Sequence, residues 1–110
     1  MNHERLQCYQ LLKEIARTIH EEAKRWPRGQ AELQDQLKRA LISAILNLTE
    51  GNTRRSSKER QRFFDISRGS LSEISACLDI AEIFNLTSSL LICDLKPKVQ
   101  SCNRMIRKLP

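Results

Sequence analysis

The chain has 110 residues, and its 19 lysines and arginines outnumber its 13 aspartates and glutamates, which gives a formal net charge of +6. This length predicts one domain, residues 1–110, with one hydrophobic core. No apolar run approaches the roughly 18 residues of a membrane-spanning helix, and the N-terminus lacks the apolar core of a secretory signal, so we expect a cytoplasmic protein. Three glycines, three prolines and one tryptophan, one tyrosine and three phenylalanines are too few for most all-β folds and favour helices.

The first predicted helix runs from His3 to about Arg25. Pro27 and Gly29 follow it and end it, since the residue before a proline avoids helical geometry. Its apolar residues recur at steps of three and four, so they share one face. They are Cys8, Leu12, Ile15, Ile19, Ala23 and Trp26.

The second predicted helix runs from about Gln30 to Glu50, and Gly51 ends it. Ile42 and Leu46 point away from its main apolar stripe, which predicts contact with a second chain. The alternative is that both side chains touch the edge of a neighbouring helix in the same chain. The main stripe consists of Leu33, Leu37, Ala40, Leu41, Ala44, Ile45 and Leu48.

The third predicted helix runs from about Ser56 to Phe84, with Ser56 or Ser57 as its cap. Gly69 and Ser70 lie in its middle, where a glycine costs about 1 kcal/mol relative to alanine. We expect another helix to approach the bare backbone there, and a local kink is the alternative. The predicted buried face consists of Phe63, Ile66, Ser67, Ser70, Ile74, Cys77, Leu78, Ala81 and Phe84.

The fourth predicted helix runs from about Ser88 to Leu109. Pro97 lies on its polar side, so the proline either bends the helix around the core or breaks it at Lys96. The apolar stripe consists of Leu91, Leu95, Val99, Cys102, Met105, Ile106 and Leu109. No segment alternates with a period of two. Four amphipathic segments with short connections therefore predict an all-α fold, an antiparallel up-down four-helix bundle.

The residues that enzymes use are scarce. His3 and His20 are the only histidines, and the sequence contains none of the common phosphate-binding, zinc or hydrolase motifs. The four cysteines have no metal-ligand spacing and are expected to be reduced apolar side chains. One group of small helical ribonucleases carries an arginine followed closely by a histidine on a late helix, a pattern absent here. We therefore expect no catalytic residues, no bound metal and no cofactor.

Positive charge gathers in two places. Arg54 to Arg68 contains six basic residues, and Lys96 to the C-terminus contains five with no acidic residue. Clustered cations are typical of proteins that bind polyanions, although basic helix exteriors can also serve solubility alone. In an up-down bundle the start of the third helix lies beside the end of the fourth, so the clusters are expected to merge. The predicted nucleic-acid-binding residues are Arg54, Arg55, Lys58, Arg62, Arg104, Arg107 and Lys108.

The three phenylalanines, Phe63, Phe64 and Phe84, are expected to lie mostly on the buried side, which disfavours binding of single strands by base stacking. Recognition of the backbone or shape of structured RNA or of a duplex is then favoured.

A stretch in the middle of the chain resembles a known family. The residues Asn47-Leu48-Thr49-Glu50-Gly51, followed by Arg55-Ser56, Lys58-Glu59, Phe63, Gly69-Ser70-Leu71 and Glu73, are similar to the signature of four-helix-bundle proteins encoded in intervening sequences of bacterial large-subunit ribosomal RNA genes. The turn at Trp26-Pro27 also fits this family. Asn47 and Glu50 are expected to be structural, tying the second helix to the turn before the third.

The resemblance implies a ring-like homopentamer. The family is also similar to the accessory variability protein of diversity-generating retroelements, which binds nucleic acid and a reverse transcriptase. We therefore expect a non-catalytic, basic, oligomeric bundle that binds nucleic acid, with structured RNA favoured over DNA. The alternative is a scaffold whose main partner is a protein, such as a reverse transcriptase in a diversity-generating retroelement.

Overall fold

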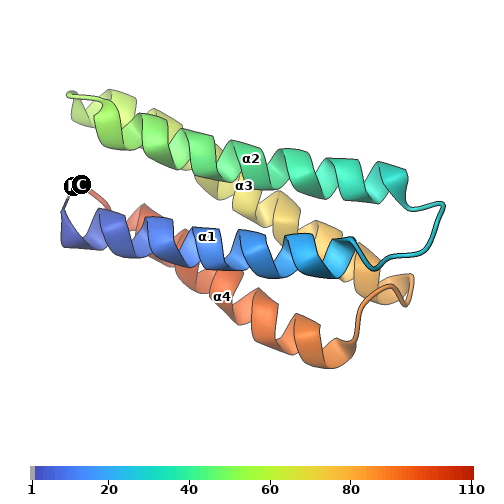
Figure 1. Cartoon of the computed structure of the whole chain (residues 1–110). Helices are drawn as coiled ribbons and strands as arrows, with labels where there is room; N and C mark the ends of the chain where they lie inside the picture. Colours follow the sequence, from blue (N-terminus) through green and yellow to red (C-terminus); the bar gives the residue numbers. More distant parts are fainter. Residues whose placement is uncertain (1) are drawn as a thin grey trace.

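A computed structural model of the chain describes residues 2–110. Its four helices are α1 (His3–Ala23), α2 (Ala31–Thr53), α3 (Ser57–Ile83) and α4 (Ser89–Arg107), and residues 2–110 contain no strand. The packed neighbours are α1 with α2, α2 with α3, α3 with α4, and α4 with α1. The elongated molecule, 44 × 23 × 18 Å, is therefore an up-down four-helix bundle (Figure 1), and the all-α prediction is confirmed.

Three of the four helices begin at a side-chain cap. The side-chain oxygen of Asn2 accepts a hydrogen bond of 2.8 Å from the backbone N–H of Arg5 at the start of α1. Ser56 and Ser88 cap α3 and α4 in the same way, with distances of 3.0 and 3.1 Å. Each cap satisfies a backbone donor that the first helical turn leaves free. Of the two predicted caps for α3, Ser56 is the one used.

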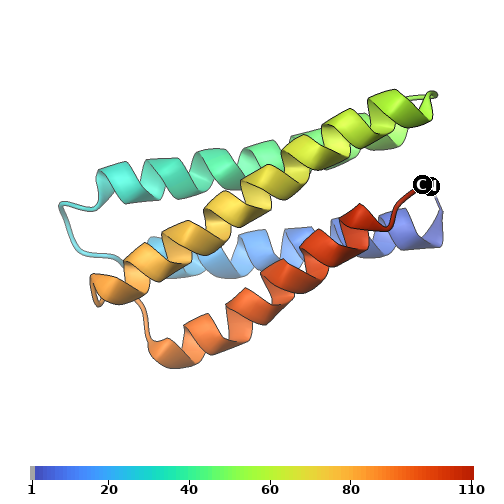
Figure 2. The ribbon, with the colours of Figure 1, turned by 180° about the vertical axis from the view of Figure 1, so that it is seen from behind.

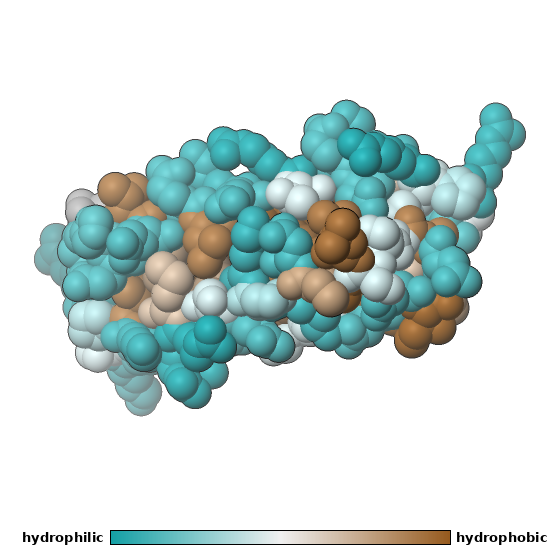
Figure 3. Space-filling view, turned by 90° about the horizontal axis from the view of Figure 1, so that it is seen from below, coloured by the Kyte–Doolittle hydropathy of each residue, from teal (hydrophilic) through white to brown (hydrophobic). Residues whose placement is uncertain are grey.

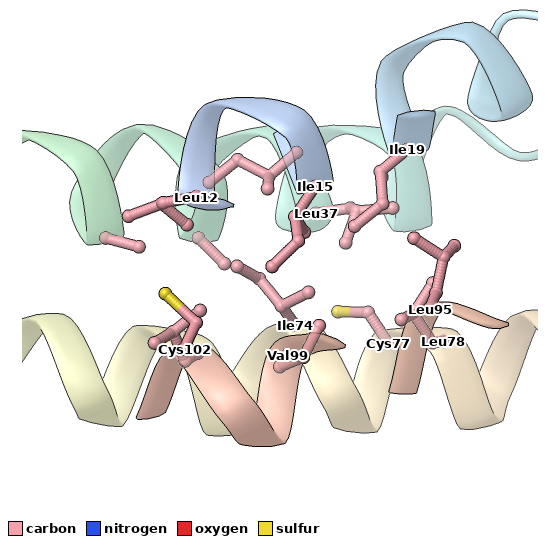
Figure 4. Close-up of a cluster of buried hydrophobic side chains, with 14 of the residues drawn as sticks. Leu12, Ile15, Ile19, Leu37, Ile74, Cys77, Leu78, Leu95, Val99 and Cys102 are labelled. Carbon is pink, nitrogen blue, oxygen red and sulfur yellow. The ribbon is translucent and has the colours of Figure 1, made fainter. Parts of the chain in front are cut away.

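The core contains side chains from all four helices. In Figure 4, Leu12 and Ile15 of α1, Leu37 of α2, Ile74 of α3 and Val99 of α4 point into one layer. The predicted face of α1 is confirmed, because Cys8, Leu12, Ile15, Ile19 and Trp26 are all buried. On α2 the buried residues are Leu37, Ala40, Leu41, Ala44, Leu48 and Gly51.

On α3 the predicted buried face is wrong at two residues in the first half of the helix, where it is rotated, and at Phe84, which lies just past the end of the helix. Phe64 is fully buried, whereas Phe63 is half-buried, and both Ile66 and Phe84 are exposed. The prediction that Phe63, Ile66 and Phe84 belong to the core is therefore wrong. The sequence allows two apolar series with steps of three and four, one through Phe63 and one through Phe64, and the two series converge at Ile74. Packing against α2 selects the second series.

That packing explains the glycine near the end of α2. The prediction that Gly51 ends the helix is wrong, because α2 continues through it to Thr53. Gly51 is buried, and a Cβ atom built on it would lie 2.6 Å from Cδ1 of Phe64. A real Cβ would overlap the ring, so only glycine allows Phe64 to sit this close to the α2 backbone.

Two other sequence predictions concern residues that are unusual inside a helix, Gly69 in α3 and Pro97 in α4. Gly69 has no atom within 4 Å of a built Cβ, so the expected close approach of another helix is wrong within this chain. Helix α3 continues through Gly69, and α4 continues through Pro97, which is exposed on the polar side. A break at Lys96 is therefore wrong.

Two cysteines lie together in the core. The thiol of Cys102 donates to the backbone carbonyl of Cys8 at 3.9 Å. Burial raises the pKa of the Cys8 thiol to about 11 and that of the Cys102 thiol to about 12. Both thiols therefore stay protonated at neutral pH and pack as small apolar groups. Across residues 2–110, no helix has the length and hydropathy of a membrane span, and no cluster of three His, Cys, Asp or Glu side chains is placed to hold a metal ion.

The corrected register of α3 makes a quantitative prediction. Phe64→Ala should lower the free energy of unfolding by about 3–5 kcal/mol, because it removes a buried ring and leaves a cavity against Gly51. Phe84→Ala makes the same chemical change on an exposed residue and should cost under about 1 kcal/mol. Urea denaturation followed by circular dichroism measures both. Equal midpoints for the two variants would show that Phe64 does not anchor α3.

Candidate nucleic-acid interface

One end of the bundle brings together the start of α1, the α2–α3 turn and the C-terminus (Figures 1 and 2). The guanidinium of Arg60 on α3 donates from Nε to the backbone carbonyl of Pro110 at 3.2 Å. Arg5 on α1 donates to the carbonyl of Asn52 near the end of α2, at 3.3 Å. The start of α3 therefore lies beside the end of α4, as predicted. Sequence reasoning missed Arg5, although the up-down order places the start of α1 at this same end.

The predicted nucleic-acid-binding residues lie at or near this end of α2, α3 and α4, and all seven are exposed. We call these residues the basic cluster: Arg54, Arg55, Lys58, Arg62, Arg104, Arg107 and Lys108. Within residues 2–110, Arg54 is the one member in an ion pair, with Glu50 at 2.9 Å. The other six have no carboxylate within ion-pair distance in the described part of the chain, so their charge is available to an external anion.

Arg60 belongs to the same run of basic residues but has an internal role. Its guanidinium donates to the backbone carbonyl of Arg54 at 3.3 Å and also to that of Arg55. Together with the bond to Pro110, these hydrogen bonds tie the α2–α3 turn and the C-terminus to one side chain. Arg60 therefore holds the backbone that carries Arg54 and Arg55.

Two lysines that the sequence placed in the C-terminal basic run are neutralised. Lys96 forms an ion pair with Asp79 on α3. Lys98 lies 3.3 Å from a carboxylate oxygen of Glu14 and 3.4 Å from one of Asp94. Hydrogen bonds from Lys98 to Glu14 and then Asp94 raise the pKa of its ammonium group. The free positive charge of α4 is thus confined to its last turns.

Phe63 lies within the basic cluster. The guanidinium carbon of Arg54 is 4.9 Å from the centroid of the Phe63 ring, and that of Arg62 is 5.2 Å from it. These are cation–π distances, at which the ring's electron-rich face attracts the charge. The sequence prediction placed this ring in the core. Two adjacent residues of a helix point about 100° apart, so Phe63 faces outward once Phe64 faces inward.

The residues of the central signature have structural contacts. Ser70 on α3 donates to the hydroxyl of Ser43 on α2 at 2.7 Å. Asn47 donates to the backbone carbonyl of Ser43 at 2.8 Å, within its own helix. The prediction that Asn47 ties α2 to the following turn is therefore wrong. Glu50 does make that tie, through its ion pair with Arg54 in the turn.

The second apolar face predicted on α2 is present. Ile42 and Leu46 have 47% and 58% of their surface exposed. The bond between Ser43 and Ser70 places this part of α2 beside the part of α3 that carries the exposed Ile66. Both α2 residues therefore point away from the core of their own chain, as predicted.

One of the comparisons with known proteins agrees with the signature. No curated protein matches this chain. A family model, described as the 23S rRNA-intervening sequence protein, matches residues 4–108, which includes all four helices apart from the first residue of α1. The resemblance seen in the central signature is thereby confirmed at the level of the family. The chain belongs to the 23S rRNA-intervening sequence protein family.

Proposed function

We propose that this protein binds RNA without catalysing a reaction, and that the basic cluster contacts the phosphate backbone. The observation that carries the proposal is the set of six exposed cations at one end of the bundle without a carboxylate partner in residues 2–110. Lys96 and Lys98, by contrast, each lie beside a carboxylate of another helix, Asp79 for Lys96 and Glu14 for Lys98. Binding of phosphates by free cations releases condensed counterions and is favourable on any sequence.

The proposal predicts a salt-dependent affinity that falls when cations are removed. Arg55→Gln combined with Lys58→Gln should weaken the binding of a structured RNA hairpin. The slope of log affinity against log salt should decrease by about 0.7–0.9 for each phosphate that the variant no longer binds. A salt titration by fluorescence anisotropy measures both the affinity and the slope.

The matched control is Lys38→Gln combined with Arg39→Gln. These two exposed residues lie on the first half of α2 and have no ion-pair partner in the described chain. The control changes the net charge by the same amount, and it should leave the salt slope of the wild type unchanged because it lies outside the basic cluster. If the wild type shows no binding at low salt, or both double variants lose affinity equally, the basic cluster is not an RNA site.

We propose further that the protein acts as a homo-oligomer, with a pentamer favoured by the family resemblance. The support from this chain is the exposed pair Ile42 and Leu46 beside Ile66, an apolar surface of the kind that marks protein contacts. A ring would repeat the basic cluster once in each copy. Several weak phosphate contacts would then act together and raise avidity without any new contact.

The oligomer prediction is tested by placing carboxylates on the exposed apolar face of α2. Ile42→Glu with Leu46→Glu should shift the protein toward the monomer, because association would bury two unpaired carboxylates. Light scattering after size-exclusion chromatography gives the mass of each variant at micromolar concentration. The control, Ile80→Glu, places a carboxylate on another exposed residue and should leave the mass unchanged. A wild-type protein that is a monomer contradicts the prediction.

A second candidate function is a scaffold for a protein partner, such as a reverse transcriptase. The supporting observation is the α3–α4 turn, at the opposite end from the basic cluster, where Ile83, Phe84 and Leu90 are 72%, 59% and 82% exposed. Asn85, with φ of 58°, and the 2.8 Å bond from Leu86 N–H to the Ala81 carbonyl hold this turn.

The charges around this turn indicate the kind of partner. Residues 69–95 contain four acidic residues and no lysine or arginine. Asp79 and Asp94 are paired with Lys96 and Lys98, whereas Glu82 beside the turn has no ion-pair partner in residues 2–110. The right-hand end in Figure 3, where the turn lies, carries apolar atoms next to hydrophilic ones. An apolar surface with the unpaired carboxylate of Glu82 beside it complements a basic amphipathic segment of a protein.

A labelled basic amphipathic helical peptide provides the test of this second candidate. Its binding should be saturable, should be abolished by Phe84→Glu, and should persist in the variant carrying Arg55→Gln and Lys58→Gln. An acidic peptide of the same hydropathy is the control. Equal binding of both peptides, or no effect of Phe84→Glu, would contradict the scaffold function.

A further inference from the structure

Phe63 differs from the other phenylalanines in its surroundings. Phe64 is fully buried and Phe84 lies at the opposite end of the bundle, whereas Phe63 is half-buried among the exposed cations of the basic cluster. The guanidinium carbons of Arg54 and Arg62 lie 4.9 and 5.2 Å from its ring centroid. The ring is therefore the centre of an aromatic and cationic assembly on the surface.

The neighbouring contacts fix this assembly in place. Phe64 fits against Gly51 and so sets the rotation of α3, which turns Phe63 outward. Glu50 holds the guanidinium of Arg54 at 2.9 Å. Arg60 donates hydrogen bonds to the backbone carbonyls of Arg54 and Arg55 in the α2–α3 turn. Arg54 is consequently positioned over the ring before any ligand arrives, which lowers the entropic cost of using it.

We propose that this assembly binds unpaired nucleotides of RNA, an inference that rests on the proposed function of the basic cluster. An unpaired base extends this stack by lying on a guanidinium that the Phe63 ring holds in place, while Arg55 and Lys58 contact the adjacent phosphates. Arginine planes and aromatic rings both stack on unpaired bases. Bases within a duplex already stack on each other and are not accessible to the ring. The ligand class is therefore a single-stranded loop, bulge or end.

The proposed stacking site reverses the expectation, drawn from the sequence, that single-stranded RNA is disfavoured as a ligand. That expectation disfavoured single strands because all three phenylalanines were assigned to the buried side. The outward position of Phe63 removes this reason, and its two cation–π partners supply the stacking surface that was missing. Phosphate contacts alone would favour a duplex, because its charge density is higher than that of a single strand.

The experiment compares two RNA probes by fluorescence anisotropy: an unstructured pyrimidine oligonucleotide and a blunt duplex with the same number of phosphates. Phe63→Leu keeps an apolar side chain and removes the ring. It should weaken binding of the unpaired probe by about 10-fold, in the range found when one base can no longer stack. Affinity for the duplex should change by less than about twofold. The salt slope should stay unchanged, because no charge is removed.

Three further variants make the result specific. Phe63→Tyr keeps a stacking ring and should retain the affinity of the wild type for the unpaired probe. Arg62→Lys keeps the charge and removes the planar group, so it should selectively weaken the same probe and provides an independent test if Phe63→Leu does not fold. Phe84→Leu removes an exposed ring at the far end and should bind both probes as the wild type does.

The failure of this inference is distinguishable from failure of the proposed function. If the wild type binds both probes and Phe63→Leu and Arg62→Lys weaken them equally or not at all, the stacking site is wrong while RNA binding by the cluster stands. If the wild type binds neither probe at low salt, both proposals are wrong.

Discussion

The contact between the Phe64 ring and the bare backbone of Gly51 determines how the end of the bundle that carries the basic cluster is built. A Cβ at residue 51 would overlap the ring, so the end of α2 and the start of α3 can approach this closely only with glycine there. The close approach brings the α2–α3 turn against the bundle, where Arg60 can reach the turn carbonyls and the C-terminus. The packing of α2 against the start of α3 and the position of the α2–α3 turn therefore depend on one contact.

The contact between Phe64 and Gly51 also determines which residues at the start of α3 face the core and which face outward. With Phe64 inward, Phe63 and Arg62 face outward, and Arg54 meets the ring from the turn. Neighbouring basic residues also differ in their contacts. Arg60 donates to backbone carbonyls, whereas Arg55 and Lys58 are exposed and have no ion-pair partner in residues 2–110. The run of basic residues in the sequence thus contains both a residue that supports the backbone and residues whose exposed charge is unpaired.

Much of the fold could be predicted from the sequence, because helical periodicity and caps are local. Most helix bounds, the faces of α1 and α2, and the exposure of Ile42 and Leu46 follow from spacing alone. The choice between Phe63 and Phe64 could not be made locally, since both fit a helical repeat and a contact with Gly51 decides it. The seven cations were identifiable as candidates, but whether a cation meets a carboxylate depends on neighbouring helices, as Lys96 and Asp79 show.

The division of charge along the bundle gives the protein an orientation in solution. Helix dipoles cancel in an antiparallel bundle, because each end carries two N-termini and two C-termini. The asymmetry therefore comes from side chains. The basic cluster gives one end an excess of positive charge, whereas toward the other end the segments 20–39 and 76–98 contain seven basic and seven acidic residues, which balance. On a body 44 Å long this separation forms an electric dipole. If the ligand is a polyanion, as proposed, its field would exert a torque on this dipole and turn the cationic end forward before contact, which would raise the association rate at low ionic strength.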